Sequence, residues 1–134
     1  MKTSLSVSIL IILMFSFAVG QPHAGLPETP VGKHVEAYLK AFNSPDQDLM
    51  RSFFQERTAT SSLAEAPVEQ RLSRFSQMKQ RLESIQLKRV VSSTSQSVTI
   101  LATSKRGAIV QLNFDFEPQP PYGLLGIRVE DLGE

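Results

Sequence analysis

Cysteine is absent from the chain and histidine is nearly so, with two among 134 residues. Without cysteine there is no disulfide, no thiol nucleophile and no thiolate metal ligand, so the fold must rely on its hydrophobic core. His23 and His34 are too few for a multi-histidine metal site. Asn43-Ser44 is followed by Pro45 and is therefore not an N-glycosylation site. We accordingly expect no metal and no cofactor.

A large excess of charge of one sign is also lacking. The chain has 14 Lys and Arg against 13 Asp and Glu, and one of the basic residues, Lys2, lies at its N-terminus. Domains that bind nucleic acids by neutralising phosphates normally carry a clear basic excess. We therefore expect no nucleic-acid partner.

The first twenty residues have the three-part pattern of a secretory signal peptide. Lys2 supplies the positive start, residues 9–15 form an unbroken apolar run, and Ala18-Val19-Gly20 is a cleavage site of small residues. The apolar core is short for a membrane span, although an uncleaved anchor helix is the alternative interpretation. We predict that residues 1–20 are removed and that the mature protein is periplasmic or extracellular, with no membrane contact.

The remainder has the length of a single domain, preceded by a leader. Residues 21–30 are rich in Pro and Gly and are predicted to form a flexible leader, followed by one domain over residues 31–134. Apolar residues at helical spacing predict a first helix over 33–42, and Asn43 suits the left-handed position that ends a helix. A second helix is predicted to begin with Ser44 as cap and Pro45 in the first turn.

A third helix is predicted over residues 67–82, after a polar segment with room for a short strand at 59–63. The pattern then changes to alternation, which predicts strands over 84–93, 97–104, 108–117 and 122–132. Helices followed by consecutive strands joined through short turns indicate the α+β class, with an antiparallel sheet packed against the helices.

Two segments resemble a known superfamily. Residues 38–46, Tyr-Leu-Lys-Ala-Phe-Asn-Ser-Pro-Asp, resemble the first-helix signature of the superfamily that includes nuclear transport factor 2, ketosteroid isomerase and the SnoaL-like proteins. Residues 117–127, Glu-Pro-Gln-Pro-Pro-Tyr-Gly-Leu-Leu-Gly-Ile, resemble the end of a small domain of this fold that precedes secreted bacterial serine hydrolases and peptidases. The resemblance implies a cone-shaped, cystatin-like fold in which three helices pack on a curved antiparallel sheet.

The isomerase chemistry of that superfamily does not carry over. Tyr38 matches the Tyr that donates to the oxyanion in ketosteroid isomerases, but the position of the general base falls at Ser61 or Ser62, where no carboxylate stands. The protonated Asp of the inner strand face has no counterpart either, because Asp115 and Glu117 lie on the polar side of their strand. We therefore expect no catalytic residues.

A binding pocket is the remaining candidate site. His34 and Tyr38 are four residues apart on one helix and, with Arg71 or Arg74, can line the open end of the cone and hold a small acid. The alternative is that Tyr38 packs its ring in the core, that His34 lies on an exposed first turn, and that the arginines form a solvated face.

These sequence features are compatible with three functions. The first is an exported, non-catalytic accessory or binding domain that contacts a protein partner, an associated hydrolase or, through its sheet face, a second copy. The alternative is a small-molecule-binding or degenerate isomerase or cyclase domain with its pocket near Tyr38. An immunity-type or inhibitor-type interaction module is the third.

Overall fold

The computed structural model describes residues 25–133, which form four α-helices and one four-stranded sheet. In chain order the elements are α1 (Pro30–Asn43), α2 (Gln47–Arg57), α3 (Thr60–Glu65), α4 (Val68–Leu82), β1 (Ile85–Ser93), β2 (Ser97–Ser104), β3 (Ile109–Phe116) and β4 (Leu124–Gly133). The α+β class is confirmed, with four helices in place of the three expected. The predicted signal peptide, residues 1–20, lies outside the described residues, as do residues 21–24 of the predicted leader.

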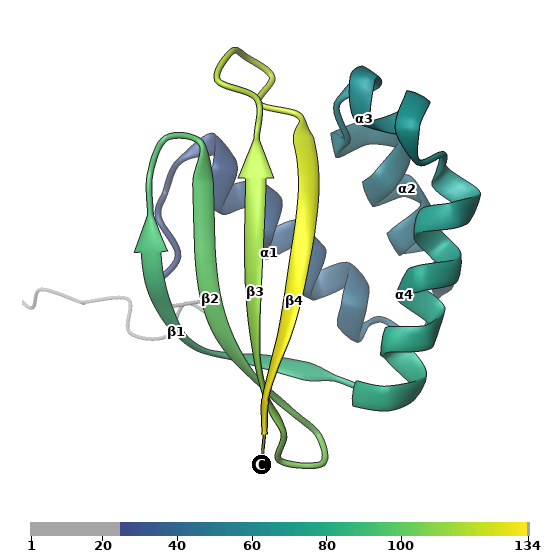
Figure 1. Ribbon diagram of the computed structural model, residues 1–134, viewed down its shortest axis with the longest axis vertical. Helices are drawn as coiled ribbons and strands as arrows, with labels where there is room; N and C mark the ends of the chain where they lie inside the picture. The colour runs from purple at the N-terminus through teal and green to yellow at the C-terminus, as the bar shows by residue number, and fades with distance from the viewer. Residues whose placement is uncertain (1–24, 134) are drawn as a thin grey trace, which may run out of the picture.

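The sheet is a curved antiparallel meander in the order β1-β2-β3-β4. α1 crosses behind the sheet, whereas α2, α3 and α4 stand beside its β4 edge (Figure 1). Within residues 25–133, no helix combines the length and the apolar character needed to cross a membrane.

The two faces of β3 are assigned correctly by the sequence. Val110, Leu112 and Phe114 are fully buried against the helices. Asp115, on the opposite face, is half exposed and lies 3.9 Å from the guanidinium of Arg128 on β4. The alternation settles this orientation because burying a row of carboxylates would cost far more than burying Val, Leu and Phe.

α1 begins three residues earlier than its periodicity indicates. The Oγ1 of Thr29 accepts a hydrogen bond from the Gly32 amide at 3.2 Å, and Pro30 occupies the first turn, where its missing N–H has no consequence. Gly32 packs so tightly that a Cβ placed there would lie 1.8 Å from the Pro27 carbonyl oxygen. Leu26 also packs against the core, so the chain contacts the domain before the first helix begins.

α2 starts two residues later than expected, and its cap is a different residue. The carboxylate of Asp46, not the hydroxyl of Ser44, caps the helix by accepting from the Asp48 amide at 2.9 Å. Ser44 instead ends α1 in an extended conformation, and its hydroxyl accepts from the Asp46 amide at 3.0 Å.

Asn43 does not adopt the left-handed conformation that the sequence suggested, because it is the last residue of α1. Its side-chain amide donates to the Ile85 carbonyl at 2.7 Å and its oxygen accepts from the Ile85 amide at 2.9 Å. The Asn43 side chain therefore forms the same pair of hydrogen bonds with the Ile85 backbone that a neighbouring strand would form, and it fixes the end of α1 to the start of β1.

The strand expected at residues 59–63 is wrong, because the segment forms the short helix α3. The residues before α3 meet the sheet through the backbone: Thr58 forms a single parallel bridge with Leu124, and the Ala59 amide donates to the Leu124 carbonyl at 2.9 Å. The chain thus makes one backbone bridge to the edge of β4 and then turns into α3, whose Ser62 hydroxyl still donates to the Leu125 carbonyl at 2.9 Å.

Candidate ligand-binding site

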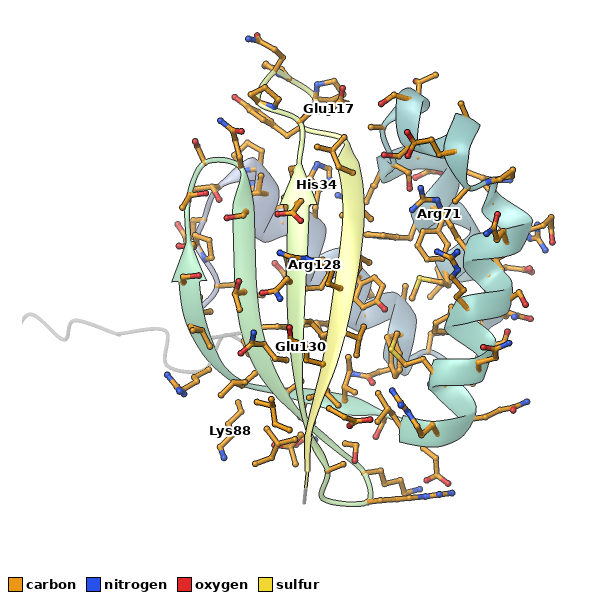
Figure 2. All side chains as sticks on the ribbon, in the orientation of Figure 1. His34, Arg71, Lys88, Glu117, Arg128 and Glu130 are labelled. Carbon is orange, nitrogen blue, oxygen red and sulfur yellow. The ribbon has the colours of Figure 1, made fainter. Side chains whose placement is uncertain are left out.

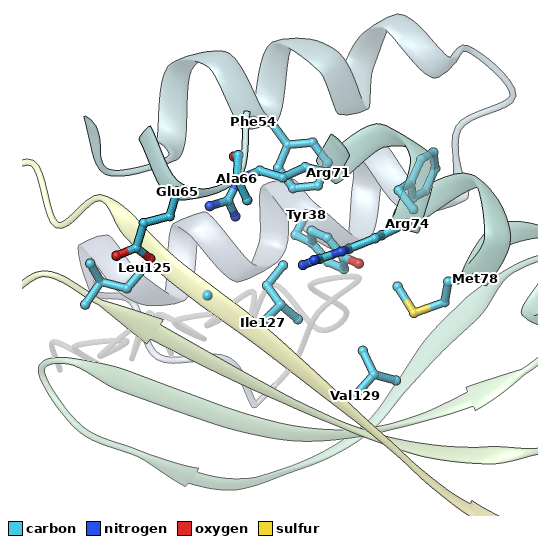
Figure 3. A pocket seen from close by; sticks show the side chains of 12 residues that line it. Tyr38, Phe54, Glu65, Ala66, Arg71, Arg74, Met78, Leu125, Ile127 and Val129 are labelled. Carbon is cyan, nitrogen blue, oxygen red and sulfur yellow. The ribbon is translucent and has the colours of Figure 1, made fainter. Parts of the chain in front are cut away.

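A pocket of about 470 Å³ lies between β4 and α4, with its floor on α1 and α2 (Figure 3). This volume is within the range of small-molecule sites in proteins. The lining side chains come from α1 (Tyr38), α2 (Phe54), the end of α3 and the residue after it (Glu65, Ala66), α4 (Arg71, Arg74, Phe75, Met78) and β4 (Leu125, Ile127, Val129), together with the backbone of Gly126. Apolar side chains therefore form most of the wall, and the polar groups are few.

Arg71 is fixed by the backbone of the neighbouring helix. Its Nε donates to the Ala66 carbonyl at 2.7 Å, and its Nη2 donates to the Ser62 carbonyl at 2.9 Å. The guanidinium thereby donates to carbonyl groups at the C-terminal end of α3, beyond which no further turn of the helix supplies N–H donors; the Ser62 carbonyl also accepts from the Ala66 amide. Burial lowers the pKa of Arg71, and the nearby charge of Arg74 lowers it further.

Arg74 lies one turn further along α4 and has a different environment. Among the described residues it has no hydrogen-bonding or ion-pair partner, and its side chain is exposed. Glu65 is the one carboxylate in the lining, and it lies beyond ion-pair distance of both arginines. Two guanidinium groups thus border the same pocket, and the charge of Arg74 is available to a ligand.

Tyr38 forms the floor of the pocket. Its ring packs edge-on against Phe53 and Phe114, with ring centroids 5.5 and 5.3 Å away, and only 1% of the residue is exposed. Burial raises the pKa of the hydroxyl, which is therefore protonated throughout the physiological range. No described residue pairs with this hydroxyl, so it can donate to a ligand in the pocket.

His34 does not line the pocket. α1 crosses the sheet so that His34 stacks on Phe116, with ring centroids 5.5 Å apart, while Tyr38 packs on Phe114. Figure 2 shows His34 at β3, well separated from Arg71 on α4. His34 and Tyr38, one turn apart on α1, therefore pack on successive inward residues of β3. The expected grouping of His34 with Arg71 or Arg74 is not found.

The two nitrogens of His34 are both engaged. Arg57 Nη1 donates to Nδ1 at 2.9 Å, and because a guanidinium can only donate, Nε2 carries the proton that binds the Pro121 carbonyl at 3.2 Å. Burial lowers the pKa of His34, and the charge of Arg57 acts in the same direction. This histidine holds the β3–β4 loop to α1 and is not placed to meet a ligand.

The position expected for a general base carries no acid–base group. Ser62 is buried, and its hydroxyl donates to the Leu125 carbonyl at 2.9 Å, whereas Ser61 is exposed. Within residues 25–133 no three His, Asp or Glu side chains come together in a way that would hold a metal ion.

Sequence reasoning identified Tyr38, Arg71 and Arg74 as ligand-binding candidates, and the structure brings these three to one pocket. Sequence reasoning did not identify Glu65, nor the pocket wall that Ile127 and Val129 form. The alternation of apolar residues along β4 predicts which of its side chains point inward. The placement of α4 beside β4 is a tertiary feature, which a local sequence pattern cannot predict.

Comparison of the chain with family models, with curated proteins and with solved structures finds no match in any of the three. The resemblance to the nuclear transport factor 2 superfamily therefore rests on the two sequence segments and on the α+β architecture.

Proposed function

We propose that this protein is an exported, non-catalytic binding domain of nuclear transport factor 2-like fold, and that it binds a small organic anion with an apolar body. One observation carries the ligand class: the pocket sets the guanidinium groups of Arg71 and Arg74 against the apolar side chains of Ile127 and Val129. Apolar walls favour a ligand with a hydrocarbon body, because both surfaces are then removed from water. A guanidinium binds carboxylates through paired hydrogen bonds.

The proposal of a non-catalytic role rests on the shortage of proton-transfer groups in the pocket. Tyr38 is a protonated donor, and Ser62 is already committed to the Leu125 carbonyl. The Glu65 carboxylate is exposed to water. Efficient acid–base catalysis requires a group whose pKa is tuned by its surroundings and which reaches the reacting proton. Binding without turnover suits this arrangement better.

The fold family is proposed from residues 38–46 and 117–127 together with the α+β architecture. Export and association with a hydrolase are proposed on the sequence alone, from residues 1–20 and 117–127. A homodimer through the sheet face has less support. The middle of that face carries the hydrogen-bonded pair Thr99 and Asn113 and the charges of Asp115 and Arg128, which are already solvated. Dimer interfaces usually have a more apolar centre.

A matched pair of ligands tests the ligand class. We expect 4-phenylbutyrate to raise the melting temperature of residues 21–134 and 4-phenylbutyramide, which lacks the charge, to have little effect. Arg74→Gln should abolish most of the shift, because a charge-assisted hydrogen bond contributes about 1.5–3 kcal/mol. Glu65→Gln should increase the shift, since it removes a negative charge from the pocket lining.

The control is Arg106→Gln, because Arg106 pairs with Glu83 at 3.0 Å and does not line the pocket. This variant should respond to 4-phenylbutyrate like the wild type. Equal shifts with the acid and the amide, or a full response in the Arg74 variant, would rule out the anion site.

A further inference from the structure

The pocket runs along an open sheet edge. Among residues 25–133, β3 is the only strand that pairs with β4, and apart from the single bridge of Leu124 with Thr58 no extended segment lies along the other side of β4, where α4 stands opposite (Figure 1). A strand edge of this kind presents unpaired N–H and C=O groups, which another extended chain can bind. The backbone groups of β4 that face this edge, and the groups that close its two ends, determine what can bind there.

The register identifies the free groups. The Phe116 amide donates to Gln96 on the β2 side, so Phe116 and its partner Leu124 are not hydrogen-bonded to each other. Beyond the bulge that follows Leu124, antiparallel pairing alternates, which places the N–H and C=O of Ile127 and Val129 at the open edge. The side chains of these two residues line the pocket. The same stretch therefore offers both hydrogen bonds and apolar contacts.

The start of β4 is closed. The Ala59 amide occupies the Leu124 carbonyl at 2.9 Å, and the Ser62 hydroxyl occupies the Leu125 carbonyl, also at 2.9 Å. A strand added along β4 must therefore stop before Leu125. At the far end, the one ion pair between α4 and β4 in the described part of the chain is the exposed pair of Arg81 with Asp131, at 2.9 Å. Exposed pairs of this type contribute little and give way readily.

A strand that reaches this closed end either turns away from the sheet or ends there, and the charges of the pocket lining favour a charged chain end. The pocket lining carries the guanidinium groups of Arg71 and Arg74 against the single carboxylate of Glu65, so on balance it attracts a carboxylate and repels an ammonium group. The terminus is therefore the carboxyl terminus, and since β4 begins at this end, the added chain runs antiparallel to it.

We propose that the ligand is the carboxyl-terminal segment of a polypeptide, added antiparallel to β4 as a fifth strand with its terminal carboxylate at Arg74 and an apolar side chain in the pocket. This inference rests on the proposed anion site and names its ligand class. Backbone hydrogen bonds to Ile127 and Val129 supply sequence-independent affinity, and the pocket selects the terminal side chain.

The experiment uses fluorescence anisotropy with a labelled hexapeptide of alternating Thr and Val that ends in Leu with a free carboxylate. Its carboxamide should bind at least about tenfold more weakly, because a charge-assisted bond is lost. N-methylation at successive positions should alternate in effect, with at least about a tenfold loss at every second residue, because only alternate amides face β4. These changes leave the protein untouched, so folding cannot confuse the result. Arg74→Gln should reproduce the carboxamide effect, and Arg106→Gln should not.

Two outcomes separate this inference from the proposed function. If 4-phenylbutyrate binds with the expected dependence on Arg74 but the peptide binds no more tightly, or N-methylation has no alternating effect, strand addition is wrong and the anion site stands. If neither the acid nor the peptide binds, both the anion site and strand addition are wrong. Sedimentation that shows a stable dimer which excludes the peptide would assign the edge to a second copy and also overturn the inference.

Discussion

Arg71 and Arg74 are the same residue type one turn apart on α4, yet the structure gives them different roles. Arg71 donates to the carbonyls of Ser62 and Ala66, whereas Arg74 has no partner among the described residues. We predict that Arg71→Met destabilises the fold and that Arg74→Met leaves it nearly unchanged. The Met side chain keeps the apolar length of the stem and removes every donor, so the comparison isolates the hydrogen bonds.

The expected size follows from the two bonds. A hydrogen bond from a charged donor contributes about 1.5–3 kcal/mol, but Arg71 is only partly buried and water replaces part of each bond in the variant. We therefore expect Arg71→Met to lower the free energy of unfolding by about 1–3 kcal/mol in total. For a domain of this size the melting temperature would fall by roughly 5–15 °C. Arg74→Met should stay within about 0.5 kcal/mol of the wild type.

Urea unfolding followed by circular dichroism measures the free energies, and hydrogen exchange locates the change. The amides of Leu63 and Ala66, which donate to the Ala59 and Ser62 carbonyls, should exchange faster in Arg71→Met, because α3 depends on this arginine. Equal stability of the two variants, or unchanged exchange in α3, would refute the view that Arg71 holds α3 in place.

Three further predictions concern the framework of the site. Gly32→Ala should be strongly destabilising in thermal unfolding, because its Cβ would lie 1.8 Å from the Pro27 carbonyl oxygen and the backbone there must move; a stable variant would refute the packing. Asn43→Ala should lower the free energy of unfolding by about 2–4 kcal/mol in urea titration, since two partly buried hydrogen bonds to β1 are lost; a change below about 0.5 kcal/mol would contradict this. His34 has a lowered pKa in the folded state, so its neutral form favours folding fully above the ordinary pKa of 6.5 and this contribution is lost as the pH falls below it. Between pH 5 and 8 the free energy of unfolding should therefore depend more steeply on pH in the wild type than in His34→Gln, and identical slopes would show that folding does not lower the pKa of His34.

The strands and the longest helix could be predicted because their signals are repeated along the chain. β3 alternates over its full length, and α4 keeps its apolar residues at helical spacing from Leu72 through Phe75 to Leu82. Such patterns determine which face is buried before any tertiary contact is known, so the α+β class followed from the sequence.

The elements that were missed are short and depend on distant partners. α3 has six residues, too few for an apolar period, and its carbonyls are bound by Arg71 from the next helix. Asn43 has the composition of a helix end, but its hydrogen bonds reach Ile85, which lies 42 residues later. Local propensity cannot identify interactions of this kind, because the stabilising partner is brought close only by the complete fold.

The strand wrongly predicted at residues 59–63 bears directly on the candidate site. A strand in this segment would have continued the parallel bridge of Thr58 with Leu124 and covered the edge of β4. The chain instead turns into α3 after one bridge, and Arg71 holds it there, away from Ile127 and Val129. The open edge, the pocket and the position of the arginines thus have one structural cause. Stabilising α3 should keep the edge available to a ligand, whereas loss of the Arg71 hydrogen bonds should free the segment to compete for it.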